Sequence, residues 1–129
     1  MFEIKAIDHL NFNVRSLDES IKFYKKYFGM DIYEEGFSSK SNLPYAIIGK
    51  TGAIFLCLYE SANEDIGSTQ MNHFGVHVNN FDEVYKKLQA QKVKLLYGGL
   101  VEYPESRSLY IADPDGIEIE LSENFGGGL

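Results

Sequence analysis

The chain has 129 residues and a formal net charge of −7 at pH 7, with 44% hydrophobic and 24% charged residues. This length and composition predict one compact domain rather than a disordered chain. The acidity disfavours nucleic acid and anionic membranes as partners, and no apolar run approaches the ~20 residues of a membrane helix. Cys57 is the only cysteine, so no internal disulfide can form, and we expect a cytoplasmic protein.

The first half of the chain reads as a strand, a helix and three more strands. Residues 5–14 alternate apolar and polar side chains, as a strand with one buried face does. Ser16 followed by Glu19 is a capping-box pattern, and apolar residues then recur at helical spacing as far as Gly29, a typical helix stop. Further strands are predicted at 30–36, 44–49 and 53–59.

The second half repeats this order. Asn80 and Glu83 form a second cap-like pair at the start of a predicted helix over 81–91. The polar stretch 60–69 reads as a linker, and ADPDG near the end of the chain reads as a tight turn. Strands are predicted at 72–78, 93–97, 107–112 and 117–122.

The two halves are copies of one pattern. A shift of 64 positions places His9 on His73 without a gap. The same shift aligns four more identical pairs: Val14 with Val78, Asp18 with Asp82, Glu19 with Glu83, and Lys22 with Lys86. Because the secondary-structure pattern repeats as well, the sequence predicts an α+β fold of two tandem βαβββ modules, at about 4–60 and 70–124.

Chemistry-bearing side chains lie on the polar faces of the predicted strands. His9 and His73 occupy equivalent places on the first strand of each copy, and Glu118 and Glu120 share the polar face of the last strand. The apolar faces must pack on the helices, so we expect the polar faces to point into one concavity. Two imidazoles and a carboxylate there can bind a divalent metal and leave positions open. A merely solvated face is the competing interpretation.

The βαβββ pair, the early histidine of each copy and the closing segment LYIADPDGIEIEL resemble the vicinal oxygen chelate superfamily. That group includes glyoxalase I, extradiol dioxygenases, fosfomycin-resistance enzymes and bleomycin-binding proteins. The resemblance covers about residues 5–123 and implies a curved, cup-shaped mixed sheet with the helices outside. It implies one divalent ion (Zn, Mn, Fe, Ni or Co) on His9, His73 and Glu120. The implied activity is that of a metal-dependent lyase, transferase or dioxygenase.

The chain departs from two reactions of that superfamily. Glyoxalase I generally has a metal ligand at the position that lies 64 residues before Glu120, where this chain has Leu56. We therefore expect Leu56 near the metal without contact to it. Extradiol dioxygenases have a histidine shortly before the Leu109-Tyr110 pair, where this chain has Val101, Glu102 and Tyr103.

The chain also departs from the fosfomycin-resistance enzymes, although SLYIADPDG is similar to a segment of theirs. Their lysine falls near Leu100, and their serine-rich potassium loop reads Tyr103-Pro104-Glu105-Ser106 here. The position of the arginine that they carry near the C-terminus would fall after Leu129, the last residue of this sequence. Their anion-binding residues are thus not repeated, and the exact reaction stays open.

Six further residues are candidates for the site. Tyr110 and His77 are the candidate catalytic residues, as donors of a proton or a hydrogen bond. Each has a competing structural interpretation, as a packed tyrosine or a partly buried histidine. Four residues could contact substrate: Asn11, Asn13, Ser108 and Arg107. Arg107 suits a substrate carboxylate, but it could equally be a solvated residue near a turn.

Two classes of function follow from these patterns. The favoured one is a metalloenzyme that acts on a small oxygenated molecule, and the alternative is a metal-free protein that sequesters a small molecule, as the bleomycin-binding branch does. We also expect a homodimer, because the chain has nine Phe and nine Tyr to bury. Each metal site would then take His9 from one subunit and His73 with Glu120 from the other.

Overall fold

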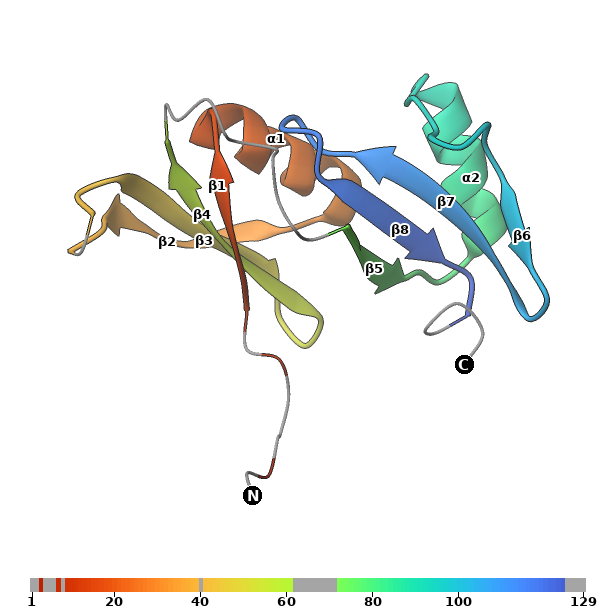
Figure 1. Cartoon of the computed structure of the whole chain (residues 1–129), viewed down its shortest axis with the longest axis horizontal. Coiled ribbons are helices and arrows are strands. Elements are labelled where there is room, and N and C mark those ends of the chain that lie inside the picture. Colours follow the sequence, from red (N-terminus) through yellow and green to blue (C-terminus); the bar gives the residue numbers. More distant parts are fainter. Residues whose placement is uncertain (1–2, 4–6, 8, 40, 62–71, 125–129) are drawn as a thin grey trace. The chain divides into compact units, whose positions relative to one another are not determined.

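The structure is a computed structural model that describes residues 3, 7, 9–39, 41–61 and 72–124. The chain divides into two compact units, one through Ser68 and one from Thr69. Among the described residues, each unit contains one α-helix and one four-stranded mixed sheet (Figure 1). This arrangement confirms the predicted α+β fold of two βαβββ units.

The first unit has the strand order β1-β4-β3-β2. Strand β1 runs parallel to β4, and the other neighbours are antiparallel. This sheet covers one side of helix α1 with apolar residues, of which Val14, Ala46, Leu56 and Leu58 have no exposed surface. The elements are β1 (Leu10–Val14), α1 (Leu17–Phe28), β2 (Asp31–Phe37), β3 (Pro44–Lys50) and β4 (Ile54–Glu60).

Both predicted ends of helix α1 are confirmed. The Ser16 hydroxyl oxygen accepts a hydrogen bond from the backbone N–H of Glu19 at 3.2 Å, which satisfies one of the free donors of the first turn. Gly29 ends the helix with φ 64°, a left-handed conformation that glycine adopts without steric cost. The predicted strand over 5–14 is shorter in the structure, because β1 begins at Leu10; residues 5, 6 and 8 lie outside the described residues.

The second unit repeats the topology with the strand order β5-β8-β7-β6. Strand β5 is parallel to β8, and β8, β7 and β6 are antiparallel neighbours. Leu109, Ile111 and Ile119 have no exposed surface and form the centre of this unit's core. The elements are β5 (His73–His77), α2 (Phe81–Ala90), β6 (Val101–Tyr103), β7 (Ser106–Ala112) and β8 (Glu118–Ser122).

Two local predictions for the second unit were wrong. Asn80 precedes helix α2, but it is left-handed (φ 54°) and its side chain makes no capping hydrogen bond. The predicted strand over 93–97 is irregular, because the chain turns through positive φ at Tyr97, Gly98 and Gly99. The Leu96 N–H of this segment donates to the carbonyl oxygen of Tyr110 in β7, 2.8 Å away. The second strand of the unit is instead β6.

The predicted turn ADPDG is confirmed and joins β7 to β8. The carboxylate of Asp113 accepts hydrogen bonds from the N–H groups of Asp115 and Ile117, both at 2.9 Å. Gly116 adopts φ 86°, which a side chain would disfavour. The turn therefore fixes where β8, with Glu118 and Glu120, begins. Neither described helix is long and apolar enough to cross a membrane.

Candidate metal centre

Strand pairing in the second unit gathers several predicted site residues on one face. Tyr110 lies opposite Glu120 across β7 and β8, and Gly75 lies opposite Glu120 across β5 and β8. His73 and Ser108 are two residues from Gly75 and Tyr110 along their strands, so their side chains point to the same side. The structure thus brings His73, Ser108, Tyr110 and Glu120, all predicted site residues, to one face of the sheet.

His73 and Glu120 are in direct contact. Nε2 of His73 lies 3.0 Å from Oε2 of Glu120, and the two side chains are 34% and 13% exposed. Two ligands at right angles around a divalent ion, each at about 2.1 Å, also lie about 3 Å apart. The spacing of the two atoms therefore fits adjacent ligands of one metal ion.

A second hydrogen bond orients the His73 ring. Nδ1 of His73 lies 2.7 Å from the Asn72 side-chain oxygen, which only accepts hydrogen bonds, so Nδ1 carries the proton of this pair. In the neutral ring, Nε2 then presents a lone pair to the Glu120 carboxylate. Two lone pairs at 3.0 Å repel each other unless a positive species, a proton or a metal ion, lies between them. The geometry of the pair is thus compatible with a proton or a metal ion between the two side chains.

Glu120 is held from its other side by Ser108. The Ser108 hydroxyl donates to Oε1 of Glu120 at 2.7 Å, and Ser108 is fully buried. This bond leaves Oε2 as the oxygen that faces His73. A carboxylate fixed in this way loses less side-chain entropy when it binds a metal. Ser108 was predicted as a substrate contact, and its observed partner is Glu120.

Tyr110 lies in a cluster of tyrosines next to His73. Its hydroxyl is 2.7 Å from that of Tyr103, and its ring makes edge contacts with His73 and Tyr97. Burial, the Tyr103 hydroxyl and the Glu120 charge raise the pKa of Tyr110 well above its ordinary value. Tyr110 is thus a protonated phenol at neutral pH, which suits a hydrogen-bond donor and not a base.

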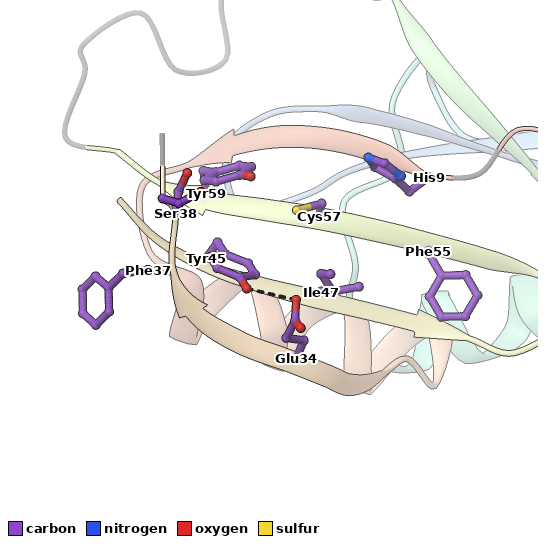
Figure 2. Close-up of a pocket in the computed structure, with 10 residues that line it drawn as sticks. His9, Glu34, Phe37, Ser38, Tyr45, Ile47, Phe55, Cys57 and Tyr59 are labelled. Carbon is purple, nitrogen blue, oxygen red and sulfur yellow. Dashed lines mark hydrogen bonds between the residues drawn. The ribbon is translucent and has the colours of Figure 1, made fainter. Parts of the chain in front are cut away.

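In the first unit, the face that carries His9 is hollowed. The hollow has a volume of about 660 Å³, and residues from β2, β3 and β4 line it together with His9 (Figure 2). His9 lies at one end and Tyr45 with Tyr59 at the other, and Cys57 and Ile47 lie between them. The predicted ligand His9 is exposed and therefore accessible to a metal ion.

The expectation for Leu56 was wrong. Leu56 has no exposed surface and packs on the helix side of its sheet. Leu10 pairs with Leu56, 46 positions later, whereas His73 pairs with Glu118, 45 positions later. The connection is one residue longer in the first unit, so the shift of 64 fails before the last strand. Cys57, on the side of the hollow, is the structural counterpart of Glu120.

Two other predicted residues lie away from His73 and Glu120. Arg107 points to the helix side of its sheet, where it makes two hydrogen bonds to the Glu123 carboxylate, one to Asp82, and a cation–π contact with Phe81. Its predicted role as a substrate contact has no support in this geometry. His77 lies at the far end of β5, with Nε2 at 3.2 Å from the Glu123 carbonyl oxygen.

Asn11 and Asn13 lie on the predicted face of β1. They pair with Cys57 and Tyr59 of β4, so they share the side of the sheet that carries the hollow, and both are exposed. They do not line the hollow itself in the described residues. Their role as substrate contacts stays a prediction.

Several residues of these faces were missed from the sequence. Glu34, Tyr45 and Tyr59 reach the hollow from separate strands, and only the strand register could have brought them together. Asn72 immediately precedes His73, a position where a side-chain acceptor for the ring could have been recognised. Among the described residues, no three His, Cys, Asp or Glu side chains form a cluster that could hold a metal. A metal ion bound by His73 and Glu120 would therefore need a third ligand from elsewhere.

The comparisons with known proteins assign the family. The sequence profile of the Glyoxalase/Bleomycin resistance protein/Dioxygenase superfamily matches residues 6–121. The chain therefore belongs to this superfamily, as the resemblance of its motifs indicated.

Its curated relatives include two proteins with different names. The chain is 31% identical over 125 residues to a metallothiol transferase FosB of Staphylococcus epidermidis, which covers 92% of this chain and 83% of the relative. It is 29% identical over 118 residues to a probable trivalent organoarsenical cleaving enzyme of Bacillus subtilis, which covers 88% of this chain and 76% of that protein.

Solved structures share the fold. A glyoxalase/bleomycin resistance protein/dioxygenase domain from Frankia superposes with a TM-score of 0.77 at 19% identity, over 96% of both chains. The fosfomycin resistance protein FosX from Listeria monocytogenes, in complex with Mn(II) and sulfate, superposes with a TM-score of 0.71 at 20% identity, over 98% of both chains. At these identities the likeness shows the fold alone.

Proposed function

We propose that this protein is a divalent-metal-dependent enzyme that acts on a small oxygenated molecule, with His9, His73 and Glu120 as metal ligands. The observation that carries this proposal is the pair His73 Nε2 and Glu120 Oε2, 3.0 Å apart and each fixed by a further hydrogen bond. Membership of the superfamily and the curated relatives named metallothiol transferase support a metal-dependent enzyme.

Each residue of the second unit's face has a distinct task in this proposal. A divalent ion on the three ligands supplies open positions for neighbouring substrate oxygens and stabilises negative charge on them. Asn72 holds the His73 ring with Nε2 toward the ligand position, and Ser108 holds Glu120. Tyr110 donates a hydrogen bond to a substrate oxygen, and Tyr103 supports its hydroxyl from 2.7 Å.

We also propose a homodimer in which His9 of one subunit completes the site of the other. Exposed apolar side chains such as Ile32, Tyr33 and Phe37, which are 47%, 52% and 71% exposed, support a partner surface. The test mixes His9→Ala and Glu120→Ala chains after joint unfolding and refolding. Mixed dimers regain one intact metal site if sites are shared between subunits, and none if each chain builds its own.

The proposal is tested by metal content. Untagged wild-type protein should bind one Mn²⁺ or Zn²⁺ per chain in equilibrium dialysis, and His73→Ala or Glu120→Gln should abolish this stoichiometric binding. Glu118→Gln is the matched control, because Glu118 lies two residues away on the same face but accepts hydrogen bonds from Tyr97. Stoichiometric binding that survives both ligand substitutions would refute the proposed site. Protein without metal affinity would instead favour the alternative, a binding protein that uses the hollow of the first unit.

A further inference from the structure

We propose that the part of the first unit's hollow that is bordered by Glu34, Tyr45 and Tyr59 binds a positively charged organic group, an ammonium, of the substrate. The proposed function is needed here only to place the substrate's oxygens near His9, and the ammonium subsite does not depend on it. The cationic subsite itself is built from Glu34, Tyr45 and Tyr59. Figure 2 shows Tyr45 and Tyr59 away from His9, and the Glu34 carboxylate lies between Tyr45 and Ile47.

The hollow is long, which separates two ends with different chemistry. Leu10 pairs with Leu56, so His9 lies beside Phe55, and Tyr59 lies four residues further along β4. Four strand residues span about 13 Å. A ligand with oxygens near His9 must therefore be elongated if its other end is to reach Tyr59.

The charge beside Tyr45 favours a cation. Glu34 is the charged side chain among the described residues that line the hollow, and no described lysine or arginine lines it. The Tyr45 hydroxyl donates to Oε2 of Glu34 at 2.9 Å, which orients the carboxylate within the hollow. A phosphonate or carboxylate there would meet a like charge without a cationic partner among the described lining residues, whereas an ammonium would meet an opposite charge.

The aromatic side chains at this end also suit a cation. The rings of Tyr45 and Tyr59 lie with centroids 5.8 Å apart and planes inclined by 36°. The faces of aromatic rings carry negative electrostatic potential and attract organic ammonium groups. Two tyrosine rings beside one carboxylate thus combine the two kinds of group that recognise such ligands.

The corresponding face of the second unit, where the structure describes it, carries similar groups. There the Tyr97 hydroxyl donates to both oxygens of Glu118, at 2.7 and 2.6 Å. The hollow beside His73, of about 390 Å³, has no described lysine or arginine in its lining. Arg107, the nearest arginine along the chain, is engaged by Glu123 and Asp82 on the helix side. Apart from the proposed metal ion, the described linings of both hollows therefore carry tyrosines and carboxylates without a lysine or arginine.

The test titrates metal-free protein with phenyltrimethylammonium and with benzenesulfonate, a cation and an anion of similar size. Binding is followed by the amide NMR shifts of residues 34, 45 and 59. We expect saturable binding of the ammonium and none of the sulfonate. Glu34→Gln or Tyr59→Leu should each weaken ammonium binding by about two- to fivefold.

Glu35→Gln is the matched control for net charge. Glu35 is the next residue of β2 but pairs with Ala46, on the helix side of the sheet, whereas Glu34 pairs with Ile47 in the hollow. Glu35→Gln should leave ammonium binding unchanged. Equal losses in the two variants, tighter binding of the sulfonate, or no ammonium binding by folded protein would each overturn the inference. Because the titration uses no metal, its result can be interpreted even if the proposed metal site is wrong.

Discussion

Cys57 of the first unit occupies the strand position that Glu120 occupies in the second. Asn11 pairs with Cys57, and Gly75, which corresponds to Asn11 in the repeat, pairs with Glu120. The two units therefore share a backbone frame but carry a thiol in one and a carboxylate in the other. This difference makes the polar faces of the two units chemically unlike.

The first prediction concerns the two faces of β4. Leu56→Ala should lower the free energy of unfolding by about 2–5 kcal/mol, because it removes fully buried side-chain atoms from the core of the first unit. Cys57→Ala should cost clearly less, because Cys57 borders the open hollow. Urea unfolding of both variants measures the difference. Equal costs would contradict the assignment of Leu56 to the core side.

The second prediction concerns the support of Glu120. Ser108→Ala removes the hydroxyl that donates to Oε1 of Glu120, so the carboxylate loses its fixed orientation. Metal affinity should fall about 10- to 100-fold. Ser106→Ala is the control, since Ser106 is also buried but accepts from the Asn124 backbone N–H. Calorimetric titration with Mn²⁺ should distinguish the two variants. An unchanged Mn²⁺ affinity in Ser108→Ala would count against the role of Ser108 in supporting Glu120.

The third prediction is the protonation state of Tyr110. Burial, the Tyr103 hydroxyl and the Glu120 charge raise its pKa in the folded state above the ordinary 10.0. A raised pKa contributes stability that is complete below pH 10.0 and is lost as the pH rises through the folded-state value. Ultraviolet titration of wild type and Tyr110→Phe should give the same phenolate absorbance up to pH 10. A difference that appears below pH 10 would show that Tyr110 ionises early and could act as a base.

The fourth prediction separates the two roles suggested for Arg107. The Arg107 guanidinium holds the pKa of the Glu123 carboxyl below its ordinary 4.5. The stability from this pair is present above pH 4.5 and disappears as the pH falls through the lowered value. Arg107→Gln should therefore be less stable than wild type at pH 7, and the gap should close in acid. Thermal unfolding of the two proteins at pH 7 and at acidic pH measures this difference in stability. Unchanged stability at pH 7, with a loss of substrate affinity alone, would favour the substrate role.

The fold was predictable from the sequence because the signals that begin and end its elements are local. Ser16, Glu19 and Gly29 each act within one turn of helix α1, and Asp113 acts within one tight turn, so their effects do not depend on distant residues. The prediction of a strand over 93–97 was wrong for the opposite reason. Its apolar residues suit a strand, but the left-handed backbone at Tyr97 and the glycines after it takes the chain off the sheet.

The site was predictable only in part. The repeat and the alternation of β8 placed His73 and Glu120 on one face, and the structure brings their side chains together. The counterpart of Glu120 was misplaced by one residue, because a gapless shift cannot detect a longer connection between strands. The residues of the hollow come from strands that are neighbours only after folding, so no spacing in the sequence could reveal them.

The most direct test of the central claim is a crystal structure of the protein loaded with Mn²⁺, with anomalous diffraction to locate the ion. The proposal predicts one anomalous peak within about 2.0–2.3 Å of His73 Nε2, Glu120 Oε2 and a nitrogen of His9, from the same chain or from a partner subunit. A peak bound by other side chains, or no peak beside His73 and Glu120 in crystals grown with excess Mn²⁺, would contradict it.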